Sequence, residues 1–175
     1  PAPLLFYGMN KREPPMDLMA QVRGFMSKKQ AQLCEDLAKK YGVSREEVAP
    51  AVDSFLNQTY GPAVRLAQDI SRMDKMVLLF IGREDCAICQ RSKPILRGFL
   101  SEHNDLVLVE QDYSQPEGLL YHIIHDQKKG MLPMIAFICN GDIKMIFTGE
   151  CLCAEAYEKF YYDMRAECCQ NLYVR

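Results

Sequence analysis

The sequence lacks any apolar run long enough to cross a lipid bilayer. A spanning helix needs about 20 consecutive apolar residues, whereas the longest run here, Met76 to Ile81, has the length of a β-strand. The first residues, Pro1 to Gly8, also lack the basic segment, long apolar stretch and cleavage site of a secretory signal. We therefore expect a cytoplasmic protein with no membrane partner.

The sequence also lacks a surplus of positive charge. It has 21 lysine and arginine residues against 23 aspartate and glutamate residues, which gives a net charge of -2. Proteins that bind the phosphate backbone of nucleic acids need a dense positive surface. Residues 37–48 resemble a helix-turn-helix, but Glu46 and Glu47 begin its second helix, where they would repel phosphates. These charges disfavour nucleic acid as a partner.

Cysteine, in contrast, is abundant, with 8 residues in a chain of 175. A chain of this length, 49% hydrophobic, can bury its own core and does not need a disulfide framework. Catalytic, metal-bound or free thiols are the better interpretation. Cys34 and Cys139 fall on apolar faces and are expected in the core. Cys168 and Cys169 are expected to form an exposed adjacent pair of unknown use.

Hydrophobic periodicity predicts helices for the first 73 residues. Apolar residues recur at helical spacing over residues 16–41, and Gly42 marks the end of that segment. Ser44 with Glu47 makes a capping box that starts a second helix. Gly61-Pro62 predicts an interruption, after which a third helix begins.

We place a domain boundary at this interruption. It separates an all-helical N-terminal extension, residues 1–61, from a second domain, residues 62–175, in which strand and helix patterns alternate. Asn140-Gly141 is a strong hairpin signal between the last two strands. The expected strands are residues 76–81, 106–112, 134–139 and 143–147, and the expected helices are residues 86–103, 116–126 and 154–167.

Cys86 and Cys89, with two residues between them, stand where the first of these strands passes into a helix. A thiol at a helix N-terminus faces unpaired backbone N–H groups and the positive end of the helix dipole, which stabilise the thiolate. Cys86 would attack a disulfide, and Cys89, one turn inward, would resolve the resulting mixed disulfide. The pattern predicts a redox-active dithiol that needs no other cofactor.

From about Ala63 to Arg165 the chain resembles the thioredoxin family. Pro94, five residues after the second cysteine, matches the proline that kinks the active-site helix of that family. Leu132-Pro133 matches its cis-proline, and Gly149 matches the glycine before its last helix. The resemblance implies a thioredoxin fold, a central mixed sheet flanked by helices, with Leu132, Pro133 and Gly149 lining the substrate groove.

The sequence also departs from that family at the dithiol. Asp85 stands where thioredoxins have a tryptophan, and the chain has no tryptophan at all. Asp85 would contact the substrate and, as a like charge, would raise the pKa of Cys86. Phe80 and Leu108 replace the buried acid and the lysine that assist proton transfer. Deprotonation of Cys89 would then use Glu84, Asp85, water or the substrate.

The leading hypothesis is a cytoplasmic thiol-disulfide oxidoreductase. Its partners would be protein disulfides and a reductase that recharges the dithiol, and its helical extension could mediate a homodimer. The alternative is a binding or adaptor module of the same fold, with zinc held by Cys86, Cys89, Cys151 and Cys153. Cys151 is also a candidate accessory thiol. His122 and His125 share a helix face and are expected to be surface or core residues.

Overall fold

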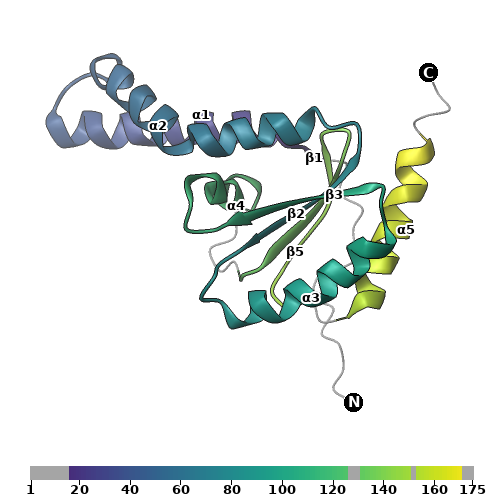
Figure 1. Ribbon diagram of the computed structural model, residues 1–175. Helices are drawn as coiled ribbons and strands as arrows, with labels where there is room; N and C mark the ends of the chain where they lie inside the picture. Colours follow the sequence, from purple (N-terminus) through teal and green to yellow (C-terminus); the bar gives the residue numbers. More distant parts are fainter. Residues whose placement is uncertain (1–15, 126–130, 151–152, 171–175) are drawn as a thin grey trace.

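The computed structural model describes residues 16–125, 131–150 and 153–170, and its centre is a five-stranded mixed sheet (Figure 1). The strand order is β1-β5-β4-β2-β3. β2 and β3 are parallel, whereas β4 is antiparallel to both of its neighbours, β2 and β5. The strands are β1 (Met16–Asp17), β2 (Met76–Gly82), β3 (Leu106–Asp112), β4 (Met134–Cys139) and β5 (Asp142–Thr148).

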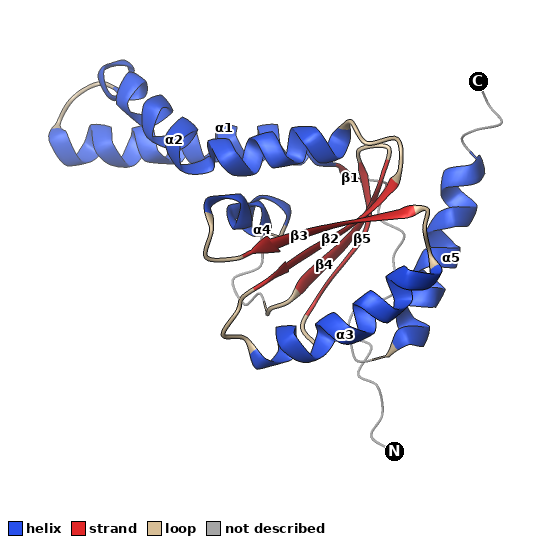
Figure 2. Cartoon of the chain, viewed as in Figure 1, coloured by secondary structure: helices blue, strands red, loops and turns tan. Residues whose placement is uncertain are grey.

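Helices pack on both faces of this sheet (Figure 2). One face contacts α1, α2 and α4, and the other contacts α3 and α5. The helices are α1 (Leu18–Tyr41), α2 (Arg45–Ser71), α3 (Ala87–Glu102), α4 (Leu120–Ile124) and α5 (Ala154–Gln170), with a 3-10 turn, η1, at Pro116–Leu119. The predicted fold class, a mixed sheet between helices with a helical N-terminal region, is confirmed. Within the described ranges, no helix has the length and apolar character that a membrane span requires.

The apolar run of β2 follows from burial on both faces. Leu79 and Ile81 belong to the cluster under α1, α2 and α4, whereas Leu78 and Phe80 belong to the cluster under α3 and α5. Successive side chains of a strand point to opposite faces. A strand covered on both faces must therefore be apolar at every position, as the run beginning at Val77 is.

The helices α1 and α2 form an antiparallel pair that extends past the edge of the sheet (Figure 1). Cys34, Val52 and Leu56 make a small core between them, so Cys34 is a buried thiol as predicted. The turn between the two helices has the predicted signals. Gly42 adopts the left-handed conformation, with φ of 66°, and Ser44 caps the second helix.

The predicted interruption of the helix at Gly61-Pro62 is not present in the structure, so that prediction is wrong. α2 is continuous from Arg45 to Ser71 and contains both Pro50 and Pro62. A proline within a helix removes one backbone hydrogen bond and crowds the preceding turn. Burial of Ala63 and Ile70 against the sheet stabilises the helix beyond the proline. The domain boundary predicted between residues 61 and 62 consequently falls inside a helix.

Two smaller differences concern segments without strong local signals. β1, which pairs with β5 through Met16 and Asp17, lies in a segment expected to be helical. The helix expected over residues 116–126 is instead the 3-10 turn η1 followed by the short helix α4, and residue 126 lies outside the described residues. Both elements depend on contacts with the sheet domain rather than on their own periodicity.

The capping box gives a direct test of the α1–α2 pair. The Ser44 backbone N–H donates to Glu47 Oε2 at 2.8 Å, and the Glu47 N–H donates to Ser44 Oγ at 3.3 Å. Ser44→Ala removes one of these bonds and should lower the free energy of unfolding by about 1 kcal/mol. Urea denaturation measures the change. Ser54→Ala, at an exposed position inside the same helix, is the matched control, and an equal loss in both variants would contradict the assignment.

Candidate active site

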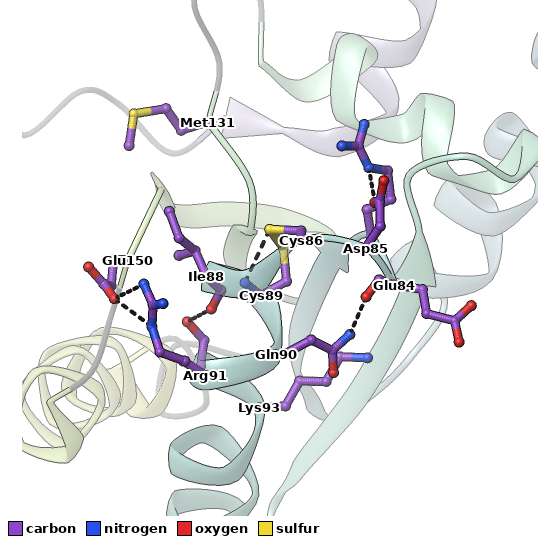
Figure 3. The surroundings of a disulfide bond; sticks show 12 residues. Glu84, Asp85, Cys86, Ile88, Cys89, Gln90, Arg91, Lys93, Met131 and Glu150 are labelled. Atoms are coloured by element: carbon purple, nitrogen blue, oxygen red, sulfur yellow. Dashed lines mark hydrogen bonds and ion pairs between the residues drawn. A yellow bond between two sulfur atoms is a disulfide. The ribbon is translucent and has the colours of Figure 1, made fainter.

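Cys86 occupies the N-cap position of α3 and is disulfide-bonded to Cys89, with the two Cα atoms 5.2 Å apart. The Cys89 backbone N–H points at Cys86 Sγ from 3.2 Å (Figure 3). Cys89 is fully buried, at 0% exposure, whereas Cys86 is partly exposed. A reagent from solvent therefore reaches the outer sulfur, which lies beside an amide donor that stabilises a thiolate.

The end of β2 positions the inner cysteine. A Cβ added at Gly82 would lie 2.7 Å from Phe80 Cε1 and 3.3 Å from Cys89 Cβ, so the missing side chain leaves room for both. Phe80 is fully buried in the same cluster as Cys89. An aromatic ring, rather than a carboxylate, thus packs close to the buried sulfur.

A charged pair lies beside this ring, with its lysine over the ring face. Lys93 Nζ is 6.0 Å from the centroid of the Phe80 ring and 2.6 Å from Glu110 Oε1. Glu110 is the register partner of Phe80 on β3. The carboxylate of this strand partner is therefore paired with a lysine.

The segment before β4, residues 131–133, forms a second wall of the site around the Cys86–Cys89 disulfide, in addition to the end of β2. The Leu132–Pro133 peptide bond is cis, and the Pro133 carbonyl accepts a hydrogen bond from the Gly149 N–H at 2.9 Å. Met131, which precedes them, is 55% exposed. Figure 3 shows Met131 and Ile88 on one side of the disulfide and Asp85 on the other. The partly exposed Cys86 thus has Met131, Ile88 and the Arg91–Glu150 ion pair on one side and Asp85 on the other.

Two ion pairs lie near the disulfide. Arg83 is bonded to Asp85, and Arg91 donates from Nη2 to Glu150 Oε1 at 2.8 Å and from Nε at 3.2 Å (Figure 3). The neighbouring Arg83 offsets the negative charge of Asp85, which reduces the repulsion that we expected at Cys86.

Farther along β3, hydrogen bonds from Ser114 lower the pKa of Asp112 from its ordinary value.

Of the other residues that the sequence predicted for the site, the structure describes Pro94 and Cys153 but not Cys151. Pro94 lies inside α3, as expected, and Cys151 lies outside the described residues. The Cys153 thiol donates to Glu155 Oε2 at 2.7 Å, which lowers the pKa of that carboxyl. In the part of the chain that the structure describes, no three histidine, cysteine or acidic side chains are grouped to hold a metal ion.

The two predicted histidines lie near the wall formed by Met131. His122 Nε2 is 2.9 Å from the Tyr113 hydroxyl, and the rings of both histidines pack against Tyr121. The Tyr121 hydroxyl in turn donates to the Met131 carbonyl at 3.4 Å. Burial lowers the pKa of His122 and of His125, so neutral imidazoles are favoured in the folded state.

The prediction for the C-terminal cysteines requires correction. Cys139 is buried, as expected, but it is disulfide-bonded to Cys168 rather than being a free thiol. Cys168 is partly buried and is not half of an exposed adjacent pair. The two cysteines are 29 residues apart in the sequence, and they meet because α5 packs back on β4. No local spacing signals this contact.

Sequence reasoning also missed Met131, Ile88 and the Arg91–Glu150 pair. The adjacency of Glu150 to Gly149 was the one available signal, because the glycine was already expected in the substrate groove. Arg91 carries no such signal, since its partner is 59 residues away.

No family model matches this sequence, and no curated protein matches it. Solved structures do match. Mitochondrial thioredoxin 3 of Saccharomyces cerevisiae has 17% identity over 57% of this chain and 87% of its own, with a TM-score of 0.46. Desulfothioredoxin of Desulfovibrio vulgaris Hildenborough has 14% identity over 55% and 88%, with a TM-score of 0.48. A thioredoxin of Nicotiana alata has 13% identity over 57% and 81%, with a TM-score of 0.47.

The mixed sheet covered by helices on both faces, and the disulfide at the start of α3, agree with what the sequence resemblance implied. The chain has a thioredoxin-like fold. β1, α1 and the part of α2 before Ala63 precede the range over which the sequence resembles the thioredoxin family.

Gly149, whose N–H bonds to the Pro133 carbonyl, allows a test of the second wall of the disulfide site. Its φ is +97°, which side chains rarely tolerate, and an added Cβ would lie 2.8 Å from Met131 Cε. Gly149→Ala should lower the free energy of unfolding by about 1 to 3 kcal/mol because of backbone strain. Chemical denaturation measures the change.

Gly98→Ala is the matched control with the opposite expected sign. Gly98 lies within α3, and nothing lies within 4 Å of an added Cβ. This substitution should raise the free energy of unfolding by about 0.5 to 1 kcal/mol, because alanine is the better helix former. Equal effects of the two substitutions would contradict the strain at Gly149.

Proposed function

We propose that the protein is a cytoplasmic thiol-disulfide oxidoreductase that acts on protein disulfides. The observation that carries this proposal is the asymmetry of the Cys86–Cys89 pair, in which a partly exposed sulfur caps a helix and its partner is fully buried. Exchange needs one accessible thiolate and one protected thiol within reach of it. The active groups are the protein's own sulfurs, and we propose no other cofactor.

In the proposed reaction, the Cys86 thiolate attacks one sulfur of the substrate disulfide and displaces the other as a thiolate. The Cys89 thiolate then attacks Cys86 Sγ, releases the second substrate thiol and forms the Cys86–Cys89 disulfide. Two electrons pass to the substrate, which leaves as a dithiol. Leu132, Pro133 and Gly149 would bind the substrate segment, and Asp85 would contact it from the opposite side.

Phe80 limits how Cys89 can lose its proton. The ring beside the buried thiol cannot accept a proton, and Lys93 already binds the nearby carboxylate of Glu110. The thiolate displaced from the substrate in the first step is a base that arrives at the site itself. We propose that it, or a water molecule beside it, takes the proton.

The partners in this proposal are protein disulfides and a reductase that returns electrons to the Cys86–Cys89 disulfide. One of the matching solved structures is a complex of thioredoxin f2 with ferredoxin:thioredoxin reductase, but a reductase for the present chain is our proposal alone. Self-association through α1 and α2 stays a prediction. The exposed side chains of Tyr41 and Phe55 on these helices are where a partner would bind.

Single cysteine variants test the roles of the two sulfurs. Cys89→Ser should trap the substrate on Cys86 as a stable mixed disulfide, because the resolving thiol is gone. Cys86→Ser should trap none, and both variants should lose reduction of insulin disulfides by at least about 100-fold, since exchange requires both thiols. Mass spectrometry identifies the adduct, and turbidity follows insulin reduction.

Cys153→Ser is the control for these measurements, since Cys153 is partly exposed and belongs to neither disulfide. It should retain the wild-type rate. Wild-type rates in both Cys86→Ser and Cys89→Ser would overturn the proposal and leave the fold as a binding module.

The binding-module alternative is favoured by one observation, the apolar surroundings of Cys89 that Phe80 creates. Its zinc form would use Cys86, Cys89, Cys151 and Cys153, and would require both disulfide partners to be reduced. Metal analysis of protein purified under reducing conditions should give well below one zinc per chain. One zinc per chain that is lost in Cys86→Ser would contradict the oxidoreductase proposal.

A further inference from the structure

The Cys139–Cys168 disulfide lies at the opposite end of the sheet from Cys86. β4 is antiparallel to β2, with Met134 beside Ile81 and Ile138 beside Val77. Cys139 therefore lies at the start of β2, whereas Cys86 follows its end. β2 has 7 residues, which at about 3.3 Å each separates the two ends by roughly 20 Å. The sulfurs of the two disulfides cannot exchange directly within one molecule.

The two sulfurs of this second pair differ in accessibility. Cys139, the last residue of β4, is 4% exposed. Cys168, near the end of α5, is partly exposed and packs against the cluster that holds this helix on the sheet. Cys168 is therefore the more accessible cysteine of the pair, and Cys139 is shielded. The Cα atoms are 6.8 Å apart, within the range that disulfides span.

We propose that Cys139–Cys168 is a second redox site, which exchanges with low-molecular-weight thiols and disulfides of the glutathione class and clamps the end of α5 to β4. Its redox equilibrium is separate from that of the Cys86–Cys89 pair. The proposal does not depend on the proposed oxidoreductase activity, because it concerns other sulfurs at another end of the domain.

The chemistry of opening is two successive exchanges. A glutathione thiolate attacks Cys168 Sγ, forms a mixed disulfide there and releases Cys139 as a thiolate, which takes a proton from water. A second glutathione thiolate attacks the glutathione sulfur of the mixed disulfide and releases Cys168. Two glutathione molecules leave as one glutathione disulfide. The two electrons that they lose reduce the protein disulfide to the Cys139 and Cys168 thiols. Closing is the reverse, with glutathione disulfide as the oxidant.

The remainder of α5 should stay in place when the clamp opens. Its rings belong to the cluster shared with α3, and the Tyr161 hydroxyl donates to Asp105 Oδ2 at 2.7 Å. Tyr157, Phe160 and Met164 are also buried there. Opening therefore releases the last turn of the helix rather than the whole element.

The test uses the full chain carrying Cys86→Ser and Cys89→Ser, in which the second pair is isolated. The protein is equilibrated in buffers of varied ratio of glutathione to glutathione disulfide, quenched in acid, denatured and alkylated. Mass spectrometry should show a two-electron transition. The oxidised protein should unfold at a temperature higher than the reduced protein by on the order of 5 °C, because the bond constrains the unfolded chain.

Two further variants in that background identify the partner sulfur. Cys168→Ser should abolish both the transition and the difference in unfolding temperature. Cys169→Ser, at the adjacent position, should keep both. The proposal is overturned if Cys139 and Cys168 stay alkylatable in glutathione disulfide, if Cys169→Ser removes the bond, or if the transition requires intact Cys86 and Cys89.

Discussion

The burial of β2 between two layers of helices is the constraint on which the other features depend. Leu78, Leu79, Phe80 and Ile81 are each fully buried, and the strand pairs with both β3 and β4. Burial of one such side chain contributes roughly 2 kcal/mol. Loss of even one of these buried side chains is therefore large against the net stability of a domain, about 5 to 15 kcal/mol. Because the strand is fixed, the helix that follows it begins at a fixed place, with Cys86 at its cap.

The replacement of a buried acid by Phe80 fits the other residues around it. A carboxylate buried at this position would need a charged partner, since an unpaired buried charge is strongly unfavourable. Leu108, which the resemblance aligns with a lysine, offers none. The charged residues beside Phe80 are Lys93 and Glu110, which pair with each other, and Lys93 lies over the Phe80 ring. The inner thiol thus lies in apolar surroundings, which is why we proposed that a group entering with the substrate or solvent takes its proton.

Local signals predicted most of the fold and the position of the dithiol. The apolar run of β2, the Asn140-Gly141 turn and the capping box at Ser44 each specify structure within a few residues, and the structure has all three. The continuity of α2 through Pro62 could not be predicted, because packing on the sheet overrides the local preference of proline. The same holds for Arg91 with Glu150 and for Cys139 with Cys168, whose partners meet only once distant helices pack.

The two disulfides lie on one helical layer, because Cys86 caps α3 and Cys168 belongs to α5. Packed aromatic rings lie between them. The Phe99 ring of α3 stacks on Tyr157 of α5, with centroids 5.4 Å apart, and contacts Tyr161 edge-on. Burial, together with the hydrogen bond to Asp105, raises the pKa of Tyr161, so its hydroxyl stays protonated and remains a donor. These contacts lie between the first turn of α3 and the last turn of α5. A change at Cys168 would therefore meet this buried aromatic layer before it reached Cys86, which supports our proposal that the two disulfides exchange independently.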